Sequence, residues 1–67
     1  MIEIIVNGEP REARKGASVA DLLAALGLPA AKVAVERNRE IVPRSRFAES
    51  GLAPGDRIEI VHFVGGG

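Results

Sequence analysis

The 67-residue chain has no cysteine, no tryptophan, no tyrosine and a single histidine. Without thiols it can form neither a disulfide framework nor a thiolate zinc site, and it has no cysteine nucleophile. The one histidine, His62, offers no cluster with credible metal-ligand spacing and has no evident acid to orient it as a catalytic base. We therefore expect no side-chain catalysis and no bound cofactor or metal.

Net charge and long apolar runs are also missing. Nine basic residues balance nine acidic ones, and two phenylalanines are the only aromatic residues. Nucleic-acid-binding domains usually carry a basic excess, and base stacking needs aromatic side chains. The apolar stretch at residues 2–6 is too short for the core of a signal peptide or for a membrane span. We expect one domain, with neither a nucleic-acid nor a membrane partner.

Strand patterns occur at both ends of the chain and in its middle. Alternating, β-branched residues predict strands at 2–6, 32–36 and 57–64, with a short strand at 41–42. Asn7-Gly8 is a strong hairpin signal, and the polar segment 9–14, which contains a proline, is typical of an edge strand. Further turns are expected at 38–40 and 52–56, and a short helical turn within 44–50.

One helix is expected in the region 18–27. Ser18 can accept hydrogen bonds from the first free amides, and Asp21 lies where a capping box requires an acid. Gly27 is placed to end the helix in a left-handed conformation. The apolar residues between these signals recur with helical spacing and form one stripe: Val19, Leu22, Leu23 and Leu26.

The element order is strand, strand, helix, strand, short strand, strand, which predicts an α+β fold. One helix must cover one face of a small sheet, because no other element can. We therefore expect a β-grasp, or ubiquitin-like, fold with a mixed four- to five-stranded sheet and one main helix packed on one face. The first and last strands are the most apolar and should lie centrally, side by side. Residues 1–64 form this domain, and residues 65–67 form a flexible glycine tail.

Alternation along the strands predicts an apolar patch on the face of the sheet that the helix leaves open. If Ile4 and Ile58 face the helix, then Ile5, Val61 and Phe63 point outward. Exposed contiguous apolar surface often marks a partner site. The alternative is that Phe63 folds over the sheet edge or enters the core at a bulge. Arg44 belongs to a basic stretch that is either solvated surface or a docking site for an acidic partner.

The chain ends in Gly65, Gly66 and Gly67. Three extended residues reach about 10 Å, and without Cβ atoms they could enter a narrow channel of another protein. A free carboxylate becomes an acyl donor once its oxygen attacks a nucleoside triphosphate and forms an acyl-adenylate. Nothing in this sequence is expected to bind ATP, so a partner would supply that step. A tail without function is the alternative for the glycines taken alone.

The whole chain resembles the sulfur carriers of thiamine biosynthesis. The resemblance is carried by four stretches: IVNGEP at 5–10, SVADLLAALGL at 18–28, VAVERNREIVPRSRF at 33–47 and LAPGDRIEIVHFVGGG at 52–67. VAVERNREIVPR is the most specific of them. The resemblance covers essentially all 67 residues.

This resemblance implies a mechanism and a set of partners. An E1-like enzyme would use ATP to adenylate the carboxylate of Gly67, and a sulfur donor such as a cysteine desulfurase or a rhodanese-type protein would convert the adenylate to a thiocarboxylate. Thiazole synthase would then take up the sulfur in the cytoplasm. Gly66 and Gly67 correspond to the terminal diglycine of the family, and Gly65 is an additional glycine beside it.

Two other readings stay open at this point. The small subunit of molybdopterin synthase has a similar fold and also uses a terminal glycine thiocarboxylate, although that family tends to be longer. A ubiquitin-like module could instead bind partners without any activation of its tail, or be joined to lysines as a protein modifier.

Overall fold

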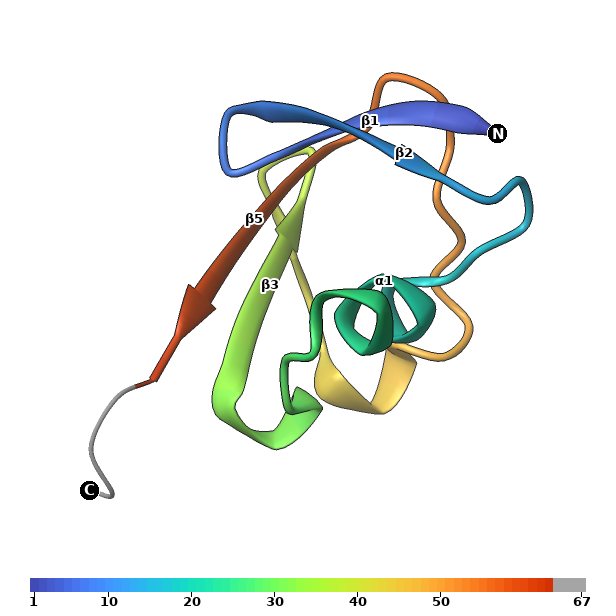
Figure 1. The fold of residues 1–67 in the computed structure, drawn as a ribbon. Coiled ribbons are helices and arrows are strands. Elements are labelled where there is room, and N and C mark those ends of the chain that lie inside the picture. The colour runs from blue at the N-terminus through green and yellow to red at the C-terminus, as the bar shows by residue number, and fades with distance from the viewer. Residues whose placement is uncertain (64–67) are drawn as a thin grey trace.

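The structure is a computed structural model that describes residues 1–63 of the chain. Its elements follow the expected order (Figure 1): β1 at Ile2–Val6, β2 at Glu9–Ala13, α1 at Val19–Leu26, β3 at Val33–Arg37, β4 at Glu40–Val42 and β5 at Arg57–His62. Short 3₁₀ turns occupy Ala30–Lys32 and Arg44–Arg46. The predicted β-grasp fold, with a mixed five-stranded sheet and one α-helix, is confirmed.

The strands form one sheet in the order β2-β1-β5-β3-β4. β1 and β5 run parallel and lie side by side, as predicted, whereas β2, β3 and β4 join the sheet through antiparallel pairs. β5 is therefore the central strand, and most of its length pairs with β3. β2, with its charges and proline, lies at an edge, where these residues discourage further pairing.

The two predicted ends of α1 are both confirmed. The hydroxyl of Ser18 accepts from the Asp21 N–H at 3.1 Å, and the Asp21 carboxylate accepts from the Ser18 N–H at 2.9 Å, which completes a capping box. Gly27 adopts φ 72°, and the next N–H, that of Leu28, donates to the Leu23 carbonyl. The helix therefore begins and ends where its local sequence directs.

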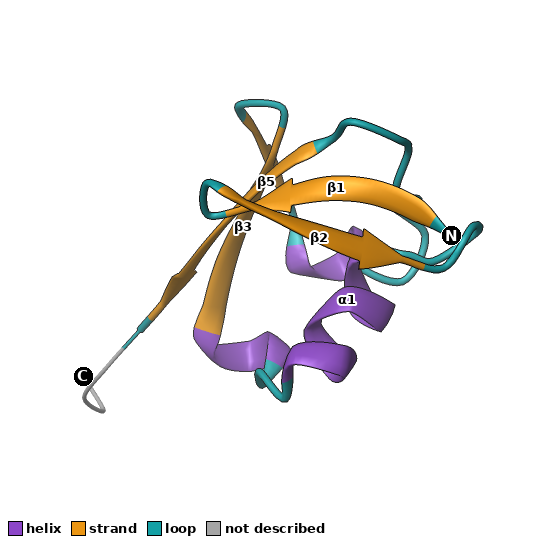
Figure 2. Cartoon of the chain, turned by 45° about the horizontal axis from the view of Figure 1, so that its top comes forward, coloured by secondary structure: helices purple, strands orange, loops and turns teal. Residues whose placement is uncertain are grey.

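The helix covers one face of the sheet, and the core lies between these two layers (Figure 2). Three members of the predicted helical stripe are buried, and Leu26 is partly buried against them. Phe47, at the end of the second 3₁₀ turn, is also buried and closes the core beside the helix. The buried apolar residues are Ile4, Val19, Leu22, Leu23, Val33, Val35, Phe47, Leu52 and Ile58.

The last strand differs from its predicted extent. β5 ends at His62, whereas the pattern predicted a strand through residue 64. Residues 64–67 lie outside the described residues, and so do the expected domain boundary after residue 64 and the glycine tail.

Candidate docking surface at the end of the last strand

The beginning of β5 is anchored by the buried carboxylate of Asp56, which is 6% exposed. This carboxylate accepts from the Asn38 amide at 3.0 Å, from Arg37 Nε at 2.8 Å and from the Ala53 N–H at 2.8 Å. Burial by itself would raise the pKa of Asp56, but these hydrogen bonds, with the charge of Arg37, lower the pKa below its ordinary value. Asp56 is therefore held ionised in the folded protein.

Asn38 extends this network to the backbone of β5. It adopts φ 52° in the turn between β3 and β4, and its side-chain oxygen accepts from the Arg57 N–H at 3.0 Å. The Asn38 N–H in turn donates to the Arg57 carbonyl. Sequence reasoning predicted a turn at 38–40 but no network. The signals that could have revealed it are the aspartate directly after a proline–glycine turn and an asparagine at a turn position.

The other end of β5 presents apolar side chains to solvent. Val61 is 59% exposed and Phe63 is 55% exposed, so the prediction that both are exposed is confirmed, and Phe63 does not enter the core. Phe63 stays in line with the strand because its N–H donates to the Lys32 carbonyl at 2.8 Å. The sheet thus carries two large apolar side chains on its helix-free face up to the last described residue.

A third exposed residue, Ile41 of β4, joins this surface. In the sheet register Ala34 lies opposite Val61, and Glu36 lies opposite both Glu59 and Ile41. These residues line a shallow hollow of about 620 Å³ on the helix-free face. We call Ile41, Val61 and Phe63 the outer patch. Sequence reasoning missed Ile41, although alternation within a short strand after a turn was the available signal.

Ile5 lies apart from the outer patch. It pairs with Pro10 and Arg57, four residues before Val61, which corresponds to roughly 13 Å along β5. Ile5 is also only partly exposed, and the charged residues Arg57 and Glu59 separate it from Val61. The prediction of one patch formed by Ile5, Val61 and Phe63 is therefore wrong in its extent. A role of Ile5 in binding stays a prediction.

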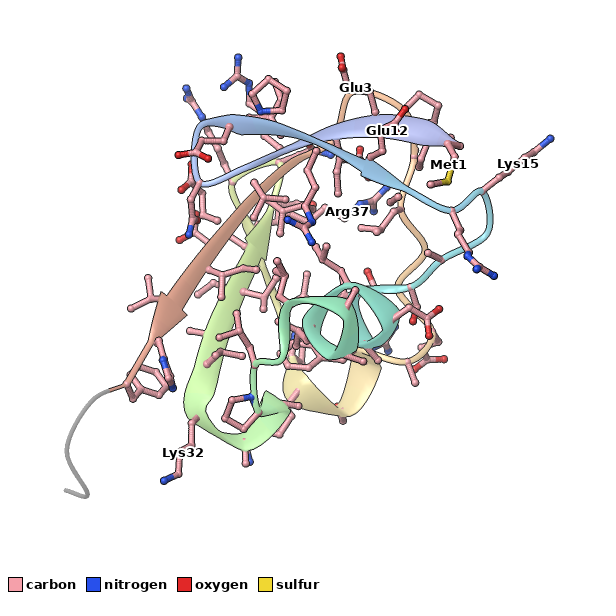
Figure 3. All side chains as sticks on the ribbon, in the orientation of Figure 1. Met1, Glu3, Glu12, Lys15, Lys32 and Arg37 are labelled. Atoms are coloured by element: carbon pink, nitrogen blue, oxygen red, sulfur yellow. The ribbon has the colours of Figure 1, made fainter. Side chains whose placement is uncertain are left out.

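Two cationic residues lie at the same end of the molecule as Phe63. Figure 3 shows Lys32 at the end where β5 finishes. Arg44 is exposed, and one of its guanidinium nitrogens lies 3.4 Å from the carbonyl oxygen of Ala31, the residue before Lys32. The predicted docking residue Arg44 therefore contacts the Ala30–Lys32 turn, and the last residue of that turn accepts the hydrogen bond from the Phe63 N–H.

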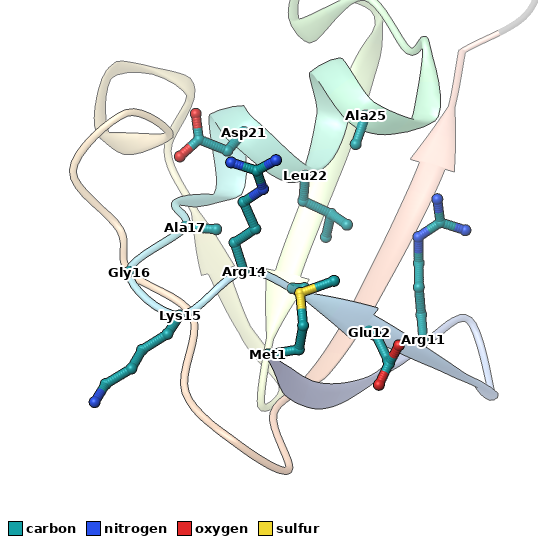
Figure 4. A pocket seen from close by; sticks show the side chains of 11 residues that line it. Met1, Arg11, Glu12, Arg14, Lys15, Gly16, Ala17, Asp21, Leu22 and Ala25 are labelled. Carbon is teal, nitrogen blue, oxygen red and sulfur yellow. The ribbon is translucent and has the colours of Figure 1, made fainter.

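A second hollow, of about 550 Å³, lies between β2 and α1 (Figure 4). Leu22, Ala25 and Met1 contribute its apolar part, and Arg11, Arg14 and Lys15 stand around it. It shares no lining residue with the hollow of the outer patch. Nothing in the structure indicates an occupant for it.

Two further findings concern metals and membranes. Within residues 1–63, no group of three or more histidine, cysteine or acidic side chains is arranged to hold a metal ion. Among the helices of that same region, none has the length and apolar character required to cross a membrane. The glycines at 65, 66 and 67, which were predicted to form the reactive end, fall beyond the described part of the chain, and their role stays a prediction.

Comparison with known proteins identifies the family. The sequence profile of the ThiS family matches residues 4–67. The chain belongs to the ThiS family. A sulfur carrier protein ThiS from Bacillus subtilis is 52% identical over 50 residues, which cover 75% of this chain and 76% of that protein. The predicted relationship to the sulfur carriers of thiamine biosynthesis is confirmed.

Structural comparison agrees with this assignment. The crystal structure of a ThiS thiamine biosynthesis protein from Geobacter metallireducens aligns with a TM-score of 0.83 and 35% identity, covering 98% of this chain and 100% of the other. A thiazole synthase from Paramagnetospirillum magneticum is 47% identical over 66 residues. The chain spans only 20% of the length of that protein, and 20% of a second thiazole synthase from Magnetococcus marinus.

Proposed function

We propose that this ThiS-family chain carries sulfur as a thiocarboxylate on Gly67 and delivers it to thiazole synthase. An oxygen of the Gly67 carboxylate attacks the α-phosphorus of ATP on an E1-like enzyme, and pyrophosphate leaves. The outer sulfur of a persulfide on a cysteine desulfurase or a rhodanese-type protein then attacks the acyl-adenylate and displaces AMP. A thiol cleaves the S–S bond of the resulting acyl disulfide, which leaves the thiocarboxylate on Gly67 and a disulfide on the sulfur donor. Gly65 and Gly66 fit the channel that leads to the partner's active site. The reaction takes place in the cytoplasm.

The observation that carries this proposal is the outer patch, which reaches the last described residue before the glycines. Ordering three glycines in a channel costs roughly 1–2 kcal/mol for each residue. Burying an exposed apolar side chain of the size of Val61 or Phe63 contributes about 1.5–3 kcal/mol at full burial. Docking of the outer patch can therefore offset the cost of ordering the tail beside it. Arg44 adds a positive charge at the same end for an acidic group of the partner.

A thiazole synthase partner is supported by the longer relatives. In two proteins named thiazole synthase, a region similar to this entire chain makes up about a fifth of the length. A carrier and the protein that consumes its sulfur benefit from being joined, because a covalent link raises the effective concentration of the carrier.

The experiment that tests the proposal is intact-mass measurement of the natural protein after incubation with ATP, an E1-like enzyme and a sulfur source. We expect one terminal oxygen to be replaced by one sulfur. Deletion of Gly67 should abolish this change and leave the thermal midpoint nearly unaltered, because a terminal residue without a side chain has nothing to pack into the core.

Four outcomes would contradict the proposal. If the mass of the carrier stays unchanged although the E1-like enzyme is active, the chain is better described as an inert binding module. Attachment of the carrier to a lysine of another protein would favour a protein modifier. A Gly67 deletion that is activated at the normal rate would show that the reactive group lies elsewhere. Sulfur delivered to a dithiolene precursor but not to thiazole synthase would favour a molybdopterin synthase subunit.

A further inference from the structure

Asn7 makes a contact with the last strand that the hairpin turn does not require. Asn7 and Gly8 both have positive φ, 49° and 84°, as the turn between β1 and β2 demands. In addition, the side-chain oxygen of Asn7 accepts from the Ile60 N–H at 2.7 Å, and its amide nitrogen donates to the Ile60 carbonyl at 3.2 Å. A glycine could supply the same turn, but it could not make either bond.

These two bonds replace strand pairing where β1 ends. Within residues 1–63, the paired register of β1 with β5 stops at Val6 and Ile58, and the Asn7 N–H donates to the Ile58 carbonyl at 2.8 Å. Beyond that point the chain of β1 turns back into β2, whereas β5 continues to His62. The Asn7 side chain therefore acts as one more residue of β1 and holds both polar backbone groups of Ile60.

We propose that Asn7 is a positioning residue that fixes the direction in which β5 leaves the domain. Without Asn7, the part of β5 after Ile58 is held by β3 alone, along one edge. With Asn7, both polar backbone groups of Ile60 are bonded on the β1 side, while β3 pairs along the other edge of β5, with Val35 opposite Ile60. This contact lies one residue before Val61 of the outer patch and three before Phe63. This inference rests on the proposed function, because its consequence is measured as presentation of the tail to the activating enzyme.

The chain contains a matched control for this proposal. Asn38 also has positive φ in a hairpin turn, and its side chain also accepts from a backbone N–H of β5, but at Arg57 near the beginning of the strand. Asn38→Gly also removes two side-chain hydrogen bonds, those with Asp56 and with the Arg57 N–H, at the opposite end of β5 from Val61 and Phe63. Asn7→Gly keeps the turn and removes the bonds at Ile60. The two variants differ mainly in which end of β5 they release.

The test measures activation kinetics with carrier as the varied substrate of the E1-like enzyme, using ATP–pyrophosphate exchange. We expect Asn7→Gly to lower kcat/KM about 5- to 10-fold, chiefly by raising KM. The end of β5 is less ordered in the free variant, and ordering it on the enzyme reduces the binding free energy. Asn7→Asp retains the acceptor for the Ile60 N–H and should fall between Asn7→Gly and wild type. Asn38→Gly should leave kcat/KM within about 2-fold of wild type when both variants are fully folded.

A second measurement tests the hydrogen bonds between Asn7 and Ile60 independently of the proposed function. Amide hydrogen exchange of Ile60 should accelerate in Asn7→Gly and stay unchanged in Asn38→Gly. Accelerated exchange with an unchanged kcat/KM would overturn the positioning role, and so would an equal loss of kcat/KM in the two variants. If the wild-type carrier is not activated at all, the proposed function fails, whereas the exchange of Ile60 still reports whether Asn7 holds the strand.

Discussion

β5 is held differently at its two ends. At its beginning, Asp56 is buried and accepts three hydrogen bonds, and Asn38 ties the backbone of Arg57 to the neighbouring turn. At its end, Val61 and Phe63 are more than half exposed. The first half of the strand belongs to the core, and the second half presents a surface.

This difference shows how one strand can serve stability and binding at once. Ile58 is fully buried, and Ile60, two residues later, is only partly buried on the same face. The charge is also distributed unequally, because the only ion pair within residues 1–63, between Arg37 and Asp56, lies at the anchored end. Substitutions at the beginning of β5 should therefore act on folding, and substitutions at its end should act on partners.

The largest expected effect is on core packing. Ile58→Ala should lower the free energy of unfolding by about 2–5 kcal/mol, because it removes a fully buried side chain and leaves a cavity. Val61→Ala, three residues later, should change it by no more than about 0.5 kcal/mol. Urea denaturation of the two variants measures both values. Similar losses in the two would abolish the contrast between the ends of the strand.

The next effect concerns the Asp56 network and its dependence on pH. The folded pKa of Asp56 lies below its unfolded value, so its contribution is complete above about pH 4 and is lost as the pH falls through the folded pKa. Asp56→Asn should cost about 1–3 kcal/mol at pH 7, since it weakens several buried hydrogen bonds. The difference in stability between wild type and variant should shrink as the pH is lowered from 5 to 2.

Denaturation across that pH range provides the measurement. A variant whose stability falls with acidification as steeply as that of wild type would show that other carboxylates, and not Asp56, govern the acid limb of the stability curve. The variant Glu49→Gln, which removes an exposed carboxylate, is the control and should keep the wild-type dependence.

The smallest effect on folding, and the largest on binding, is expected at Phe63. Phe63→Glu should leave the free energy of unfolding within about 0.5 kcal/mol of wild type. It should weaken binding to the E1-like enzyme about 10-fold, because a charge replaces an apolar anchor of the outer patch. Ala24→Glu places the same charge at an exposed position of α1 that lines neither hollow and should not affect binding. Titration calorimetry with each variant distinguishes these outcomes.

Local signals were sufficient to predict most of the fold. Ser18, Asp21 and Gly27 marked the ends of α1 because capping depends on residues only a few positions apart. Asn7-Gly8 marked the first hairpin for the same reason. The order of the elements, with a single helix available, was enough to predict that the helix covers one face, and the apolar character of the first and last strands predicted that they lie centrally.

The candidate site was predicted less completely. Alternation placed Val61 and Phe63 on the outer face, but alternation alone cannot show which strand lies across from them. The register of β3 with β4 brings Ile41 into the same surface, and the register of β1 with β5 leaves Ile5 at a distance. Both facts depend on pairing between segments far apart in the chain.

The sequence by itself determined most of the secondary structure, the family and the presence of the glycines at 65–67 that the proposal makes reactive, because each of these depends on residues that are close together in the chain. Only the tertiary structure decided how β5 is held. Asn38, which bonds Asp56, and Asn7, which bonds Ile60, lie in turns that are 18 and 53 positions away in the chain. Contacts at such separations depend on how the strands pair, and a local pattern does not encode that pairing.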